Sequence, residues 1–412
     1  MARPCPSQQK KQHYAYDLSF YVLDLSSPLS NELSLAATAS LSSISAEDWD
    51  RCAGAANPFV SHAFLSALED SGAVCAATGW QPQHLFGRTA GKISGVMPLY
   101  LKNHSYGEYV FDWNWAEAYE QAGGRYYPKL QGGIPFSPVP GPRLLLAADT
   151  SPIFRQTLIR GAEAICENLS ASSVHVPFPD ETDWHAFGEA GWLQRLGLQF
   201  HWHNQGYKTF DDFLNALASR KRKHIRKERE AAHDSGVEFI QITGSDLGAE
   251  HWDAFYRFYL NTSDRKWGQA YLPREFFTLI GERMPERILL VLGRRHGGWI
   301  CGALNLIGDD CLYGRNWGSD DDIKFLHFEA CYYQAIDFAI AHGLKRVEAG
   351  AQGPHKLARG YLPVPTYSAH FIRDENLRNP VAQFVKRERK IIERQIAELA
   401  AESPYRQSGS QA

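Results

Sequence analysis

The chain has 412 residues, which is long enough for two or three domains that each bury a hydrophobic core. With 44% hydrophobic and 22% charged residues, the composition excludes a disordered, collagen-like or coiled-coil protein for most of the chain. The formal net charge of −3 excludes a basic field over the whole molecule, so a site for a polyanion would have to be local.

Residues 1–40 are predicted to be a disordered leader. Asp17 and Asp24 interrupt the apolar stretch that a secretory signal needs, and apolar runs such as Ile288–Leu292 are far shorter than a membrane span. The cysteines form no CxxC pair and no zinc spacing, which predicts free thiols in a reducing compartment and no metal. We therefore expect a cytoplasmic protein, and the serine-rich stretch 26–45 leaves import into an organelle as the weaker alternative.

A pattern of strands and turns occurs twice along the chain. Each copy has a strand ending in Gly-Arg, a turn with glycine, a second strand with an early glycine, and an aromatic segment containing Asn-Trp. This pattern predicts a three-stranded antiparallel meander in which the pairs Asn114-Trp115 and Asn316-Trp317 lie on the third strands. The copies cover residues 84–101 with 109–119, and 288–308 with 311–321.

Each meander is followed by a predicted helix and a short strand. The helices are expected at 153–169 and 325–342, and the strands at 173–177 and 345–349. Two related α+β lobes explain the repeat better than a chance resemblance of glycine-rich hairpins. The predicted boundaries are a first lobe 41–205, a linker 206–236, a second lobe 237–376, a final helix 377–402 and a disordered tail 403–412.

The linker contains a strongly basic segment. Residues 210–236 are expected to form one helix with a narrow apolar stripe, ended by Ser235-Gly236. Such a charge run is either a solvated face or a surface for a phosphate-rich partner, such as a nucleotide cofactor or a tRNA backbone. The residues that would contact tRNA are Arg220, Lys221, Arg222, Lys223, Arg226 and Lys227.

The densest polar segment is 347–370. Glu348 ends a predicted strand, and a glycine-rich turn leads from it into a short helix. Backbone amides in such a turn can hold a phosphate or a carboxylate, although a tight turn with solvated charges is the alternative. No Walker motif and no GxGxxG is present, so nucleotide hydrolysis and dinucleotide binding find no support. The candidates on the turn and helix are Gly350, Gln352, Gly353, His355, Lys356 and Arg359.

A second group of candidates would bind the substrate. It consists of Arg315 and Trp317 on a predicted strand, His327 at the start of a helix, and Tyr367. Core packing for the aromatic residues and a buried hydrogen bond for the histidine are the alternatives. His201 and His203 alternate on one strand without a third ligand at a suitable spacing, so no metal site is predicted there.

Four long segments carry a family resemblance: HSYGEYVFDWNWAEAY, SRKRKHIRKER, LHFEACYYQAIDFAI and EAGAQGPHKLARGYLPVPTYSAH. In sequence and order they resemble the FemAB-like branch of the GNAT acyltransferase superfamily, a group of predicted N-acyltransferases, over roughly Asn57 to Arg373. The resemblance implies two tandem GNAT-like lobes, each a meander with flanking helices. It also implies transfer of an acyl or aminoacyl group to an amine.

The chain departs from the family pattern at two points. A lysine that helps to place the transferred group corresponds to Lys356, but His355 stands where an aromatic residue is usual. The pyrophosphate-binding loop of ordinary acetyltransferases is not apparent, which puts acetyl-CoA in doubt.

The resulting hypothesis is direct attack of an amine on an acyl donor, without a covalent enzyme intermediate. Glu348 or His355 would remove the proton of the amine, and Lys356 with the Gly350–Gly353 amides would stabilise donor phosphate or the oxyanion. Arg359 would assist in binding the donor. The leading hypothesis takes acyl-CoA as co-substrate and a small-molecule or peptide amine as acceptor. The alternatives are an aminoacyl-tRNA-dependent transferase and a non-catalytic protein that binds an amine or peptide.

Overall fold

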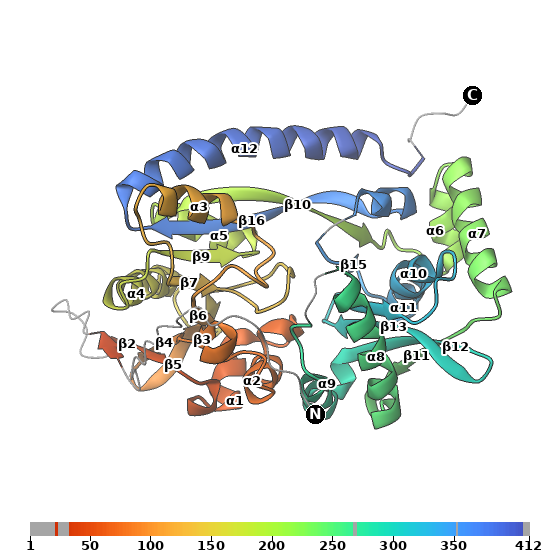
Figure 1. Ribbon diagram of the computed structural model, residues 1–412, viewed down its shortest axis with the longest axis horizontal. Helices are drawn as coiled ribbons and strands as arrows, with labels where there is room; N and C mark the ends of the chain where they lie inside the picture. Colours follow the sequence, from red (N-terminus) through yellow and green to blue (C-terminus); the bar gives the residue numbers. More distant parts are fainter. Residues whose placement is uncertain (1–20, 24–32, 267–269, 352, 407–412) are drawn as a thin grey trace.

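The computed structural model describes residues 21–23, 33–266, 270–351 and 353–406 (Figure 1). In the first half of the chain the helices are α1 (Ala46–Ala53), α2 (His62–Asp70), α3 (Trp113–Gln121), α4 (Phe154–Asn168) and α5 (Glu181–Glu189). The strands are β1 (Tyr21–Leu23), β2 (Leu33–Thr38), β3 (Trp80–Pro82), β4 (His84–Thr89), β5 (Lys92–Met97), β6 (Leu99–Lys102), β7 (Lys129–Gly132), β8 (Leu145–Leu146), β9 (Ser173–Pro177) and β10 (Leu193–His203).

In the second half the helices are α6 (Phe210–Ala216), α7 (Ser219–Asp234), α8 (Ala249–Lys266), α9 (Arg274–Arg283), α10 (Leu326–Phe328), α11 (Gln334–Ala341) and α12 (Glu375–Ala401). A π-helical turn, Glu329–Tyr333, joins α10 to α11, and a 3-10 helix spans Pro354–Arg359. The strands are β11 (Glu238–Thr243), β12 (Ile288–Arg295), β13 (Gly298–Ile307), β14 (Cys311–Ser319), β15 (Arg346–Glu348) and β16 (Leu362–Ile372).

The strands form two sheets and confirm the predicted α+β class. A 5-stranded sheet has the order β1-β2-β4-β5-β8. An 11-stranded sheet runs through both lobes in the order β11-β12-β13-β14-β15-β10-β16-β9-β7-β6-β3. Helix α12 lies along one face of this sheet over β10 and β16, and α6 and α7 lie at the end of the second lobe (Figure 1).

The two halves repeat one plan. Strand β2 pairs with β4 and β4 with β5, all antiparallel, as β11 pairs with β12 and β12 with β13. A helical segment then links two parallel strands, α4 between β7 and β9, and α10–α11 between β14 and β15. The shared order is what a duplicated lobe would produce.

The last strand of each half lies among strands of the other half. Strand β10, from the first half, pairs with β15 over His201–His203, and β16, from the second half, pairs with β9 over Ser368–Ile372. Strands β10 and β16 also pair with each other in antiparallel fashion. The boundary predicted at residue 205 therefore separates two stretches of sequence but not two separate sheets.

An apolar core also joins the lobes. Phe64 on α2 packs edge-on against Phe276 on α9, with ring centroids 5.6 Å apart. Phe59 packs in the same way against Tyr313 on β14 at 5.4 Å. Because these aromatic residues belong to one buried cluster, separating the lobes would expose part of the core to water.

Two local predictions about the first half of the chain are wrong. Residues 113–121 form helix α3 and not a strand, because Trp115, Ala116 and Tyr119 follow a helical spacing and pack on Ile372 and Leu377. The predicted leader contains strand β2, whose alternate residues Leu35 and Ala37 are buried. The other residues of the leader, 1–20 and 24–32, lie outside the described residues.

The basic segment and the tail also differ from expectation. Residues 210–234 form two helices, α6 and α7, because the backbone of Leu217 is extended and its side chain enters the core. In the predicted tail, Tyr405 packs on Phe213 and its hydroxyl donates to the Gly360 carbonyl at 2.9 Å. Burial of this ring orders the end of the described chain, and residues 407–412 lie outside it.

Candidate active-site cavity

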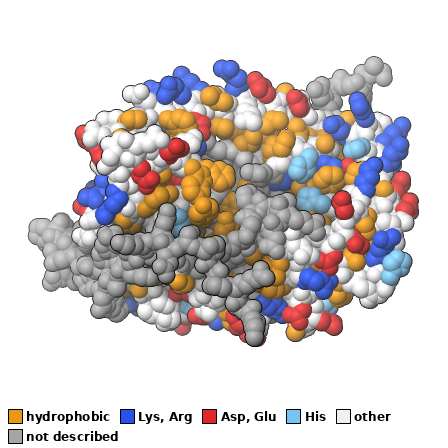
Figure 2. Space-filling view, viewed as in Figure 1, with side chains coloured by type: hydrophobic (Ala, Val, Ile, Leu, Met, Phe, Trp, Pro, Cys, Tyr) orange, Lys and Arg blue, Asp and Glu red, His pale blue; other side chains and the backbone are white. Residues whose placement is uncertain are grey.

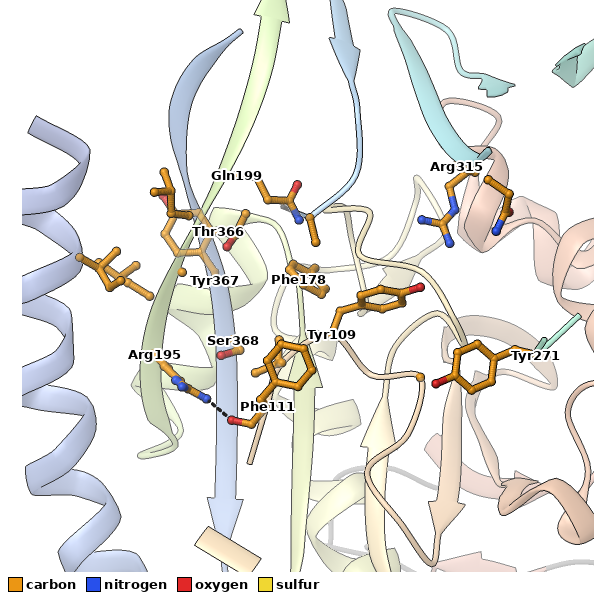
Figure 3. A pocket seen from close by; sticks show the side chains of 18 of the residues that line it. Tyr109, Phe111, Phe178, Arg195, Gln199, Tyr271, Arg315, Thr366, Tyr367 and Ser368 are labelled. Carbon is orange, nitrogen blue, oxygen red and sulfur yellow. Dashed lines mark hydrogen bonds between the residues drawn. The ribbon is translucent and has the colours of Figure 1, made fainter. Parts of the chain in front are cut away.

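A cavity of about 570 Å³ lies between the lobes. Its walls come from the loop 107–111, from residues 195–199 of β10, 315–317 of β14 and 366–368 of β16, and from positions on α8 and α12 (Figure 3). Four residues predicted to bind the substrate, Arg315, Trp317, His327 and Tyr367, all line it. A pocket of this size accommodates a small organic substrate.

The diverging strands explain why β14 reaches the cavity. Strands β14 and β15 pair only from Cys311 to Tyr313, after which β15 ends at Glu348 while β14 continues to Ser319. Residues 315–317 therefore have no β15 neighbour on that side.

Arg315 is a partly buried cation on the cavity wall. Its guanidinium donates to the Phe136 carbonyl, and no carboxylate of the described residues lies within ion-pair distance of it. Burial lowers the pKa of Arg315 below its usual range, although Tyr109 opposes this effect. A cation in such surroundings is suited to bind an anionic group of a ligand.

Arg195, on the other side of the cavity, already has a carboxylate partner. Its Nε and Nη2 atoms donate to the two oxygens of Glu388 at 2.7 and 2.9 Å. Its Nη1 donates to the Phe111 carbonyl at 2.9 Å (Figure 3). This guanidinium is neutralised within the protein, so Arg315 is the better candidate for contact with an anion.

Glu348, predicted as a base, points into the protein interior and does not line the cavity. One of its oxygens lies 3.0 Å from Arg346 Nε and 3.9 Å from His201 Nδ1. Burial raises the pKa of Glu348 to about 7, against the opposing effect of Arg346. The pKa of Glu348 is shifted toward neutral pH, but the residue lies at the end of β15 beside Arg346 and His201 and not on the cavity wall.

The raised pKa predicts a pH-dependent stability. Between about pH 4.5 and 7 the folded chain keeps a proton on Glu348 that the unfolded chain has lost, so the free energy of unfolding falls as the pH rises. The contribution is about 3 kcal/mol across this window. Urea titrations of Glu348→Gln should show a flatter pH dependence than the wild type, whereas Glu398→Gln on the exposed face of α12 should not. If the free energy of unfolding depends equally on pH in all three proteins, Glu348 does not have the raised pKa.

The other predicted donor-binding residues are held by internal contacts. Lys356 is buried and its Nζ donates to the Gly350 carbonyl at 2.8 Å, while burial lowers its pKa to about 8. His355 Nε2 lies 2.9 Å from the Tyr332 hydroxyl. Gly350 and Gly353 both adopt positive φ angles, which explains the need for glycine in this turn. Ala351 of the turn lines the cavity, and Gln352 lies outside the described residues.

Arg359 forms a buried ion pair with helix α7. Its Nε and Nη2 atoms donate to the two oxygens of Glu228 at 3.0 and 2.5 Å, and its guanidinium lies 3.4 Å from the centroid of the Phe328 ring. Its Nη1 donates to the His355 carbonyl at 2.8 Å, so all three nitrogens of the guanidinium have partners within the protein. The pair fixes the basic helix to the 3-10 helix that follows the 350–353 turn.

The outer face of α7 is strongly basic. Arg220, Lys223 and Lys227 are exposed, and within the described part of the chain no ion pair is formed by these three. Arg226 pairs with Asp211 at 3.0 Å, and Arg222 contacts Asn215. Figure 2 shows lysine and arginine side chains gathered over the end of the molecule where α7 lies. The predicted basic surface is present as a local feature of a nearly neutral chain.

The structure also contains a buried ionic cluster that the sequence analysis missed. Lys129 Nζ donates to Asp112 Oδ2 at 2.5 Å, to Glu108 Oε2 at 2.7 Å and to Ser105 Oγ at 2.7 Å. The Lys102 Nζ atom lies 3.7 Å from Glu108 Oε1. One feature of the sequence could have revealed this cluster, namely the lysine within the buried strand β7. A buried lysine is rarely unpaired, so it indicates acidic partners nearby.

No group of three or more His, Cys, Asp or Glu residues that could hold a metal ion occurs within the described ranges. No helix in this part of the chain is both long and apolar enough to cross a membrane.

A family model described as FemAB-like, peptidoglycan biosynthesis/recognition, matches residues 40–407. The chain belongs to the FemAB-like family. It is therefore an enzyme, a transferase of the acyl or aminoacyl class. A search of curated proteins found no significant match to the sequence of this FemAB-like protein.

Solved structures share the fold of this FemAB-like protein. The crystal structure of FemX is 12% identical with a TM-score of 0.52, covering 82% of this chain and 98% of FemX. The C-terminal domain of a putative lysylphosphatidylglycerol synthetase from Agrobacterium fabrum is 9% identical with a TM-score of 0.50, covering 82% of this chain and 96% of that domain. At these identities the likeness concerns the fold.

Proposed function

We propose that this FemAB-like protein transfers an aminoacyl group from an aminoacyl-tRNA to an amine bound in the cavity. The observation that carries this proposal is the connection between the basic helix and the cavity. Helix α7 exposes cations on its outer face, while Glu228 on the same helix pairs with Arg359. Arg359 ends the 3-10 helix that follows the turn containing the cavity residue Ala351. An RNA bound along α7 would therefore contact the helix that the Glu228–Arg359 pair joins to this turn.

The reaction needs a neutral amine and a carbonyl held in line with it. The amine nitrogen forms a bond to the ester carbonyl carbon, the bond from that carbon to the ribose oxygen breaks, and this oxygen receives the proton lost by the amine. Arg315 would bind an anionic group of the acceptor and so place the amine.

The thioester donor predicted from the sequence is the second candidate. Its support is the glycine turn 350–353, whose positive φ angles at Gly350 and Gly353 follow the point where β14 and β15 part. Lys356 and Arg359, however, are engaged by Gly350 and Glu228, which leaves fewer cations for a pyrophosphate than the sequence suggested.

Binding of RNA tests the choice of donor. Arg220→Gln/Lys223→Gln/Lys227→Gln should weaken binding of charged tRNA at least tenfold at about 100 mM salt and make the salt dependence shallower, because fewer counterions are released. The matched control, Lys386→Gln/Arg387→Gln/Lys390→Gln, removes the same charge from exposed positions of α12 and should bind as the wild type does. Equal losses in both triple variants would contradict a specific RNA surface on α7.

Turnover tests the reaction itself. The wild type is incubated with tRNA charged with labelled amino acids, or with CoA thioesters, together with a pool of amines and short peptides, and products are read by mass spectrometry. Transfer from charged tRNA supports the proposal, and transfer from thioesters alone supports the second candidate. Tight binding of an amine without transfer from either donor would support a non-catalytic binding protein instead.

A further inference from the structure

Two serine and histidine pairs face each other in the central sheet. Ser173 and His175 lie on β9, and Ser368 and His370 lie on β16, with the same spacing. The antiparallel register places His175 directly opposite His370, and their Nδ1 atoms are 2.7 Å apart. Each histidine also contacts the serine of its own strand, His175 Nε2 with Ser173 Oγ at 2.8 Å and His370 Nε2 with Ser368 Oγ at 3.0 Å.

The two ends of this hydrogen-bonded chain differ. Ser368 is only 3% exposed but lines the cavity, whereas Ser173 is fully buried and does not line it. At the inner end, His175 Nε2 lies 3.8 Å from Asp112 Oδ2 and 3.2 Å from the Tyr126 hydroxyl, which donates to the same carboxylate oxygen at 2.6 Å. The chain therefore runs from the cavity to a buried carboxylate.

Both imidazoles are neutral at neutral pH. Burial lowers the pKa of His175 to about 3 and that of His370 well below its usual value. The cations of Lys129 and Arg195 act in the same direction on both rings, and Asp112 opposes them. Two neutral rings at 2.7 Å share one proton between their Nδ1 atoms, so one ring donates and the other accepts.

The carboxylate decides which ring donates. Burial alone would raise the pKa of Asp112, but Lys129 outweighs it and holds the pKa below its usual range, so Asp112 is ionised. The Tyr126 hydroxyl gives its proton to this carboxylate, so its oxygen can only accept from His175, which favours the tautomer of His175 with its proton on Nε2. Nδ1 of His175 then accepts from Nδ1 of His370, and the free Nε2 lone pair of His370 faces the Ser368 hydroxyl.

We propose that Ser368 is a catalytic residue that takes up the proton of the attacking amine and passes its own proton into the His370–His175 pair. This inference rests on the proposed acyl transfer to an amine. The N–H bond of the amine breaks and a new O–H bond forms on Ser368, while the original Ser368 proton moves to His370 Nε2. The His370 Nδ1 proton moves to His175 Nδ1, so His175 carries the positive charge transiently, 3.8 Å from the Asp112 carboxylate, until the proton is returned. The reverse shifts return one proton through Ser368 to the leaving oxygen of the donor.

The buried serine provides a matched control for a structural role. Ser368→Ala and Ser173→Ala each remove one hydroxyl that contacts a buried histidine, but only Ser368 reaches the cavity. We expect Ser368→Ala to lower kcat at least a hundredfold with KM within about threefold of the wild-type value, Ser368→Thr to restore part of kcat, and Ser173→Ala to stay within about threefold. Equal losses in the two alanine variants would overturn the proposal.

A second measurement is independent of any substrate. Histidine ¹⁵N chemical shifts, assigned with His175→Gln and His370→Gln, report which ring nitrogen carries the proton. The expected result is His370 protonated on Nδ1 and His175 on Nε2, with this preference lost in Asp112→Asn. A proton on His370 Nε2 in the wild type would overturn the relay. If the wild type turns over neither charged tRNA nor thioesters, the proposed function fails, and the tautomers still decide whether the relay exists.

Discussion

Lys129→Met is expected to lower the free energy of unfolding by about 3–5 kcal/mol, because it removes the cation that both buried carboxylates contact. Both Glu108 and Asp112 have less than a tenth of their surface exposed and contact Lys129 Nζ directly. Burial lowers the pKa of Lys129, but the two carboxylates outweigh it and raise the pKa above its usual value, which shows how strongly the cluster favours the charged amine. The loss should appear as a lower urea midpoint at pH 7.

The pH dependence of this variant separates a charge effect from a packing effect. Without Lys129, the pKa values of Asp112 and Glu108 in the folded state should rise, so the variant should recover stability as the pH falls from 7 toward 5. Lys92→Met, at the exposed start of β5, is the control and should change the midpoint little. A variant whose loss is the same at pH 5 and pH 7 would point to packing alone.

Arg315→Ala is expected to reduce kcat/KM of the transfer reaction by about 100- to 1,000-fold, which corresponds to about 3–4 kcal/mol of transition-state binding. The reason is that Arg315 lines the cavity and, among the described residues, no carboxylate compensates its charge. Arg315→Lys should retain part of the activity, because a lysine keeps the charge but lacks the paired donors of a guanidinium.

The control for Arg315 is a surface arginine that already pairs with a carboxylate of the protein. Arg294 is exposed and pairs with Glu238 on the surface of the second lobe, so Arg294→Ala should leave kcat/KM unchanged. The donor and acceptor are those found in the turnover experiment with the wild type. Full activity in Arg315→Ala would show that the anionic group binds elsewhere.

Several site residues could be predicted from the sequence because local periodicity determines their direction. Arg315 and Trp317 alternate along one strand, and His327 begins the next helix, so a repeat that aligns strand and helix also brings them to one cavity. The same reasoning failed for residues 113–121, where aromatic residues suit either a strand or a helix and the partner surface on α12 decides.

The roles of other residues depend on contacts far along the chain. Whether Arg359 faces a ligand or the interior depends on Glu228, which belongs to a different helix. Lys129 is buried only because Glu108 and Asp112 fold back toward it from a loop. The His175–His370 pair needs β9 and β16 side by side, and their order in the sheet does not follow the order of the sequence.

The exchange of β10 and β16 between the halves determines how the enzyme can change shape. Each half completes its sheet with a strand of the other half. A hinge motion that separates the lobes would therefore break the backbone hydrogen bonds between these strands. Access to the cavity must therefore depend on movement of its loops and side chains, while the sheet keeps its position. In this protein, substitutions in wall residues such as 107–111 would then change the shape of the cavity, while the distance between the lobes stays constant.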